Sequence, residues 1–280
     1  MPTFLARDGT ELAYAVHGEG APLVCVPGGP MRASAYLGTL GGLSASRQLI
    51  MLDLRGTGRS GLPADPASYR CDRLTDDVGA MLDQLGVGNV DLLAHSAGAN
   101  IAVQYATRYP ERIGKLALIT PSGRAAGLAP DQGARQAVIT LRRGEPWFGD
   151  AAAAFERLDA GAGTDEDEDA IAPFFYGRWD AIARAHSAAC ETQVNEDAAA
   201  AFGSDGAFDP PALRAALAEF GSPVLVLAGG VDLQWPPAVL AEFAGLFPAA
   251  RFLVQPDAGH YPWLDDATGF VAAVTTFLAD

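Results

Sequence analysis

Short apolar runs without polar alternation recur along the chain, and helical stretches separate several of them. In the first part of the chain these runs are Pro22–Val26, Gln48–Leu52, Val90–Ala94 and Lys115–Thr120. Such a run is typical of a strand that is buried on both faces. Leu74 to Leu85 carry apolar residues at helical spacing, and Ala97–Arg108 is predicted as a helix that stops before Pro110. This alternation predicts an α/β fold, with a mostly parallel central sheet flanked by helices.

The middle of the chain follows a different pattern. Residues 121–222 contain helical stretches rich in alanine and charge, and no convincing strand. Strands resume at Pro223–Ala228 and Arg251–Val254, before a last helix. A long insertion into a sheet is typical of a cap, or lid, over a functional site. We therefore predict a core of residues 1–120 and 223–280, with a mainly helical cap of residues 121–222 inserted after the fourth parallel strand.

The charge balance and the cysteines limit the classes of function. Thirty-four acidic and 19 basic residues give a formal net charge of −15, which repels nucleic acid and anionic membranes. The N-terminal segment Met1–Asp8 lacks the apolar region of a signal peptide, and no apolar run approaches the ~20 residues that span a bilayer. Cys25, Cys71 and Cys190 form no CxxC pair. We expect a cytoplasmic protein with reduced thiols, no metal, no cofactor and a small-molecule substrate; nothing in the sequence indicates the oligomeric state.

A serine lies where the third apolar run turns into a helix, in Ala94-His95-Ser96-Ala97-Gly98. A sharp strand-to-helix turn lifts a serine hydroxyl above the edge of a sheet, and small flanking residues leave room for the turn. The usual pattern is G-x-S-x-G, so Ala94 is a mild departure. Ser96 is therefore a candidate nucleophile, with helix capping as the alternative role.

A serine nucleophile needs a base, and the base needs an acid that orients it. Of the four histidines, only His260 lies in a loop between the last strand and the last helix. Asp232 lies just past the end of the strand at Pro223–Ala228. The carboxyl ends of parallel strands meet at one edge of a sheet, so these residues are expected to converge on Ser96. The predicted catalytic residues are Ser96, Asp232 and His260.

A tetrahedral intermediate needs backbone N–H groups placed around its developing negative charge. Ala97 follows the nucleophile at the start of a helix, so its N–H is one candidate donor. The loop after Pro22–Val26 contains Gly28 and Gly29, where the backbone can approach a substrate closely. We predict Gly29 and Ala97 as the two oxyanion donors, since Pro30 has no N–H.

These motifs together resemble the α/β-hydrolase superfamily over nearly the whole chain, and within it the proline iminopeptidase-like branch. The segments that carry the resemblance are Val26–Pro30, Leu52–Ser60, His95–Gly98 and Ala258–His260. The resemblance implies the α/β-hydrolase fold, with a helical cap and a Ser-Asp-His triad. It predicts a serine hydrolase that cleaves a small ester, lactone, thioester or amide through an acyl-enzyme.

The sequence departs from the peptidases of this branch in two places. Their oxyanion motif reads His-Gly-Gly-Pro-Gly, whereas this chain has Pro27 and Met31 at its two ends. Their cap carries a glutamate in an Ala-Arg-x-Glu stretch that pairs with the substrate amine, and here His186 stands in that place. Glu191 and Glu196, on what is predicted to be the same helix, could substitute for it. A proline iminopeptidase-type aminopeptidase is therefore one alternative; others are a biosynthetic enzyme with the same triad, acting by carbon–carbon cleavage or elimination, and a non-catalytic ligand-binding relative.

Aromatic residues of the cap and of the triad loops suggest an apolar acyl site, with ordinary core packing as the alternative for each of them. The predicted substrate-pocket residues are Gly28, His95, Trp147, Trp179, His186, Trp235 and Trp263.

Overall fold

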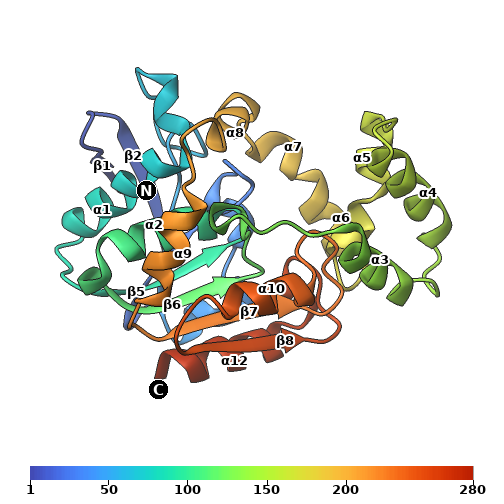
Figure 1. Ribbon diagram of the computed structural model, residues 1–280. Coiled ribbons are helices and arrows are strands. Elements are labelled where there is room, and N and C mark those ends of the chain that lie inside the picture. Colours follow the sequence, from blue (N-terminus) through green and yellow to red (C-terminus); the bar gives the residue numbers. More distant parts are fainter. Residues whose placement is uncertain (280) are drawn as a thin grey trace.

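The structure is a computed structural model that describes residues 1–279. Within this range, eight strands form one sheet in the order β1-β2-β4-β3-β5-β6-β7-β8 (Figure 1). The strands are β1 (Thr3–Leu5), β2 (Glu11–His17), β3 (Pro22–Val26), β4 (Gln48–Leu52), β5 (Val90–His95), β6 (Ile113–Ile119), β7 (Val224–Gly229) and β8 (Ala250–Gln255). β2 is antiparallel to both β1 and β4, and every other pair is parallel. The predicted mostly parallel sheet is confirmed.

Helices cover both faces of the sheet, because successive strand residues point to opposite sides. In β3, Val24 and Val26 join the larger apolar cluster, while Leu23 and Cys25 join the cluster on the other face. The larger cluster packs under α1 (Cys71–Gln84), α2 (Gly98–Arg108), α9 (Pro210–Ala218) and α10 (Pro237–Ala244). The opposite face is covered by α11 (Pro262–Asp265), α12 (Ala267–Ala279) and the short 3₁₀ helices Ser34–Leu37 and Leu40–Ala45.

The segment between β6 and β7 is mainly helical. It contains α3 (Gln132–Leu141), α4 (Phe148–Asp159), α5 (Asp165–Ala170), α6 (Ala181–Ala188), α7 (Cys190–Gln193), α8 (Glu196–Phe202) and α9. In Figure 1, α4 and α5 lie farthest from the sheet, whereas α9 lies beside α2 on the core and packs against it. A small apolar cluster that includes Val138, Ile139 and Phe174 holds the outer helices together. Among residues 1–279, no helix has the length and apolar character needed to cross a bilayer.

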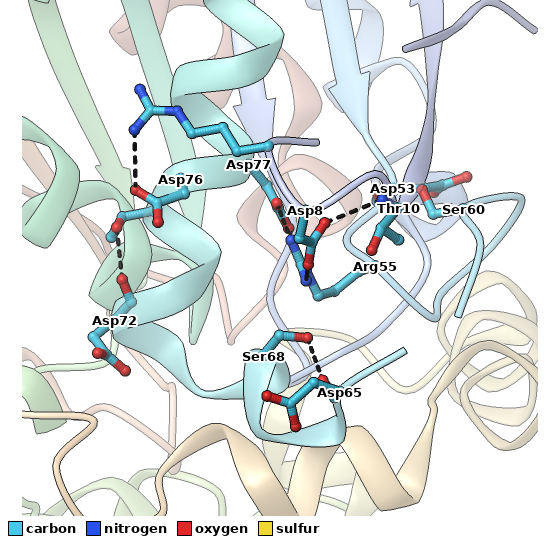
Figure 2. A network of polar contacts seen from close by, with 12 residues as sticks. Asp8, Thr10, Asp53, Arg55, Ser60, Asp65, Ser68, Asp72, Asp76 and Asp77 are labelled. Carbon is cyan, nitrogen blue, oxygen red and sulfur yellow. Dashed lines mark hydrogen bonds and ion pairs between the residues drawn. The ribbon is translucent and has the colours of Figure 1, made fainter. Parts of the chain in front are cut away.

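The Gly-rich turn after β4 is anchored by a buried charge pair (Figure 2). The Arg55 guanidinium donates two hydrogen bonds to the carboxylate of Asp77 on α1, and a third, of 2.6 Å, to Asp8 in the β1–β2 hairpin. Asp53, two residues before Arg55, accepts hydrogen bonds from the backbone N–H and hydroxyl of Ser34. The turn therefore joins the hairpin and α1 to the loop that follows β3.

The pair is expected to contribute strongly to stability. Asp77→Ala should lower the free energy of unfolding by about 3–5 kcal/mol, because it leaves the buried Arg55 without its main partner. The neighbouring Asp76 is the matched control, since it lies 3.9 Å from Arg7 and 3.8 Å from Arg108 at the surface. Asp76→Ala should cost no more than about 1 kcal/mol. Urea unfolding of the two variants measures the difference, and equal losses would contradict this role for the buried pair.

Candidate active site

Ser96 lies in the turn between β5 and α2 with a left-handed backbone, φ = +51°. Non-glycine residues rarely adopt this conformation, and it costs energy that the surrounding structure must offset. The turn is possible because α2 approaches the end of β3 closely at Gly98, where an added Cβ would lie 2.3 Å from the carbonyl oxygen of Pro27. Ala94 is fully buried in β5, so the sheet accommodates its methyl group in place of the usual glycine. The strained turn holds the Ser96 hydroxyl at the carboxyl edge of the sheet.

His260 and Asp232 meet at the same edge, from the loops after β8 and β7. His260 Nδ1 lies 2.8 Å from Asp232 Oδ2, and both side chains are buried. The second oxygen, Asp232 Oδ1, accepts a hydrogen bond of 2.8 Å from the backbone N–H of Gln234. A proton on Nδ1 that is donated to Asp232 leaves Nε2 as the basic nitrogen. Ser96 and His260 line one cavity, and within residues 1–279 the Ser96 hydroxyl has no hydrogen-bond partner.

Two backbone N–H groups near Ser96 lack protein acceptors. Among residues 1–279, neither the N–H of Gly29 nor that of Ala97 donates to a protein atom. The preceding N–H, of Gly28, is occupied by the hydroxyl of Tyr36 at 2.7 Å. Gly28 also sits against the serine turn, since a Cβ there would lie 2.8 Å from Ser96 Cβ. This close approach leaves the amides of Gly29 and Ala97 available to an oxyanion.

His95 connects the two loops that carry these groups. Tyr36 donates its hydroxyl proton to His95 Nδ1 at 2.6 Å, and His95 Nε2 donates to the backbone carbonyl of His260 at 2.9 Å. The bond from Tyr36 requires a neutral imidazole, because Nδ1 must accept a hydrogen bond there. Burial, reinforced by the nearby His260, holds the pKa of His95 well below its ordinary value. Nothing in the sequence singled out Tyr36, because its role depends on how the loop after β3 folds back onto β5.

Two cavities meet at Ser96, and both are also lined by Gly29 and Gln234. The first, which we call the arginine cavity, has a volume of about 290 Å³, and its wall includes Arg124 and Arg135. The second, which we call the carboxylate cavity, has a volume of about 400 Å³. Its wall includes four acidic residues: Glu168, Asp169, Glu191 and Glu196. The reacting serine thus lies between two spaces of different charge.

The predicted pocket residues divide into two groups. Trp235 lines the arginine cavity and His95 lines the carboxylate cavity. The others lie outside both walls: Gly28, Trp147, Trp179, His186 and Trp263. Two of these tryptophans pack edge-on against other rings. The ring centre of Trp147 lies 5.0 Å from that of Phe174 in the small apolar cluster of the cap, and the ring centre of Trp263 lies 4.8 Å from that of His95.

His186 supports the cap from behind the carboxylate cavity. Its Nδ1 lies 2.9 Å from the hydroxyl of Tyr176, which lines that cavity. Burial, with the positive charge of Arg32 nearby, lowers the pKa of His186 to about 4. Within residues 1–279, the buried Arg32 donates hydrogen bonds to neutral groups, the side chains of Gln193 and Tyr261 and the backbone carbonyl of His186. Its guanidinium also lies 4.5 Å from the centre of the Tyr36 ring. A neutral His186 therefore sits beside an arginine that forms no ion pair in the described part of the chain.

The cap also contacts the catalytic loop directly. The backbone N–H of His260 donates a hydrogen bond of 2.7 Å to the carbonyl oxygen of Phe175 in the cap. Gly259 allows this contact, since a Cβ there would lie 2.5 Å from the same oxygen. The cap is therefore hydrogen-bonded directly to the backbone of the candidate base.

The architecture is that of α/β-hydrolase enzymes. It combines a mostly parallel sheet covered by helices on both faces, a helical insertion after β6 and a serine at the β5–α2 turn. The family model for the alpha/beta hydrolase fold matches residues 21–267. The chain therefore belongs to the α/β-hydrolase family.

The known relatives match different shares of this chain and of their own length. A proline iminopeptidase from Heyndrickxia coagulans is 23% identical, over 94% of this chain and 92% of its own length. A cis-3-alkyl-4-alkyloxetan-2-one decarboxylase from Shewanella oneidensis is 38% identical, but over only 41% of this chain and 37% of its own length. The first two curated relatives are matched over less than half of their own length. Among solved structures, a proline iminopeptidase from Mycobacterium smegmatis gives a TM-score of 0.76 at 23% identity, covering 99% of this chain and 98% of its own. At 23% sequence identity, the structural similarity shows a shared fold alone.

Proposed function

We propose that this enzyme is a serine hydrolase that cleaves a small ester, lactone, thioester or amide through an acyl-enzyme. Ser96 is the nucleophile, His260 is the general base and acid, and Asp232 orients His260. The N–H groups of Gly29 and Ala97 bind the oxyanion. The observation that carries the proposal is the His260–Asp232 pair at 2.8 Å, placed beside a serine whose backbone is held in a strained turn.

The geometry supports a two-step reaction. In the first step Ser96 Oγ bonds to the substrate carbonyl carbon while its proton passes to His260 Nε2, and the same proton then protonates the leaving group as its bond breaks. In the second step water adds to the acyl carbon, gives its proton to His260 and releases the acid as the Ser96 oxygen regains a proton. The carbonyl oxygen carries negative charge in both steps, where two preset N–H donors stabilise it.

One observation favours a proline iminopeptidase-type aminopeptidase as a second candidate. Four acidic residues line the carboxylate cavity, and such groups can compensate the desolvation of a substrate ammonium group. Two of them, Glu191 and Glu196, belong to the separate short helices α7 and α8 rather than to one helix as predicted. The buried charge of Arg32 in the same wall opposes a second cation. We therefore keep the ester-type substrate as the first candidate.

Paired substrates separate the two candidates. We expect kcat/KM for a small carboxylic ester to exceed that for proline-p-nitroanilide by at least about tenfold, or about 1.4 kcal/mol in transition-state stabilisation. Because activated leaving groups alone favour esters, the control is an amino-acid ester with a free or an acetylated amine. Acetylation should leave kcat/KM nearly unchanged. A loss of about a hundredfold on acetylation, about 2.7 kcal/mol, would instead favour the aminopeptidase.

A further inference from the structure

The charged residues around the two cavities are separated by sign on either side of Ser96. Within residues 1–279, the wall of the arginine cavity contains Arg124 and Arg135 and no acidic residue. The wall of the carboxylate cavity contains four acidic residues and one arginine. The whole chain carries a formal net charge of −15, so a cavity with a positive wall differs from the rest of the molecule. An anionic substrate group is favoured in the arginine cavity and repelled by the other.

Neither arginine of this cavity is neutralised by the protein. In the described part of the chain, the guanidinium groups of Arg124 and Arg135 have no ion pair and no hydrogen-bond acceptor. Arg124 is exposed, and Arg135, on α3, is half-buried. A planar guanidinium presents paired N–H donors that match the two oxygens of a carboxylate. Both side chains are therefore available to bind an anion.

The backbone that carries Arg124 is fixed relative to the nucleophile. The N–H of Ala125 donates to Asn100 Oδ1 at 2.9 Å, and Asn100 Nδ2 donates to the carbonyl oxygen of Ala97 at 3.0 Å. Asn100 thus ties the start of the cap to the residue after Ser96. A substrate group bound at Arg124 would therefore have a defined position relative to Ser96. Such binding would orient the reacting carbonyl toward the nucleophile.

The position of His260 indicates which part of the substrate enters each cavity. The leaving group must be protonated by His260, and His260 lines the carboxylate cavity but not the arginine cavity. The leaving group is therefore expected on the side of the carboxylate cavity. The acyl group then extends the other way, past Ala97 and toward the two arginines.

We propose that the arginine cavity is an acyl subsite for substrates whose acyl chain ends in a carboxylate, which Arg124 and Arg135 bind. This inference rests on the proposed serine hydrolase function and names the substrate class of that site. The substrates are half-esters of dicarboxylic acids, or the corresponding lactones, thioesters and amides. Hydrolysis of a half-ester consumes one water and releases the dicarboxylic acid and the alcohol.

The test compares two ethyl esters with acyl chains of the same length, ethyl hydrogen adipate and ethyl hexanoate, by the release of ethanol. Wild-type enzyme should prefer the half-ester by about tenfold in kcat/KM, and rising ionic strength should weaken the preference. The double variant Arg124→Gln/Arg135→Gln should lose about tenfold on the half-ester, mainly through KM, and less than about twofold on ethyl hexanoate. The double variant Arg59→Gln/Arg143→Gln is the matched control, because these two exposed arginines line neither cavity and their loss removes the same two positive charges.

The outcomes distinguish this inference from the proposed function. A wild-type preference for ethyl hexanoate would overturn the acyl subsite, as would equal losses on both esters in the double variant with unchanged circular dichroism. Hydrolysis of ethyl hexanoate that depends on Ser96, without any preference for the half-ester, would overturn the subsite alone. Hydrolysis that survives Ser96→Ala would overturn the proposed function itself.

Discussion

Replacing Ser96 by alanine is expected to lower kcat on a small ester by about 10⁶-fold. The reason is geometric. Among the described residues, the hydroxyl at the β5–α2 turn is that of Ser96, which shares a cavity with His260 and lies near the free amides of Gly29 and Ala97. The remaining oxyanion donors and the cavity walls would support only weak catalysis by water. The measurement is steady-state hydrolysis under saturating substrate, with the uncatalysed rate subtracted.

A matched serine variant separates loss of the nucleophile from a general effect. Ser204→Ala removes an exposed hydroxyl in the loop after α8 that lines neither cavity, so it should retain wild-type activity. Thermal unfolding of both variants should match that of wild type. If Ser96→Ala kept more than about a tenth of the wild-type rate, another residue would have to be the nucleophile.

The second large effect is expected for Asp232→Asn, at about 10⁴-fold in kcat. The amide keeps the shape of the carboxylate but can present its NH₂ group to His260 Nδ1, now 2.8 Å from a carboxylate oxygen. His260 would then carry its proton on Nε2, where it cannot accept the proton of Ser96. The charge that stabilises the imidazolium in the transition state is also lost.

Asp257→Asn provides the control for this effect. Asp257 lies in the loop after β8, a few residues before His260, and is exposed. Its substitution removes the same charge from the same region, so only the direct contact to the imidazole differs. Asp257→Asn should change kcat by less than about twofold, since exposed charges act weakly at a distance. Similar losses of kcat in the two variants would mean that Asp232 acts only through its negative charge and not through its contact with the His260 imidazole.

The central strands β3 to β7 were largely predictable because each contains an apolar run in a two-sided core. Pro22–Val26 and Gln48–Leu52 were predicted with the bounds that β3 and β4 have. Helix α10 (Pro237–Ala244) was not predicted, since a short apolar stretch with little polar alternation gives a weak helical signal. The meeting of His260 and Asp232 followed from a simple rule, that the carboxyl ends of parallel strands share one edge.

The walls of the cavities were less predictable, because they depend on how the helices of the cap pack. Trp147 and Trp263 were predicted as pocket residues; neither lines the two cavities, and their rings pack against Phe174 and against His95. Arg124 and Arg135 carry no local sequence signal, since the fold of the cap brings both of them into the wall of one cavity. Tyr36 is similar, because its hydroxyl reaches both Gly28 and His95 across a folded loop. Periodicity predicts which face of an element is buried, but it does not predict what that face meets.

The most direct measurement is covalent labelling with a fluorophosphonate, followed by peptide mass spectrometry. The Ser96 oxygen would bond to phosphorus as fluoride leaves and the serine proton passes to His260. We expect one adduct per chain, on Ser96, with activity falling in proportion to labelling and no adduct on the Ser96→Ala variant. An active enzyme that resists the reagent, or an adduct on a different residue that accounts for the inhibition, would contradict the assignment of Ser96 as the nucleophile.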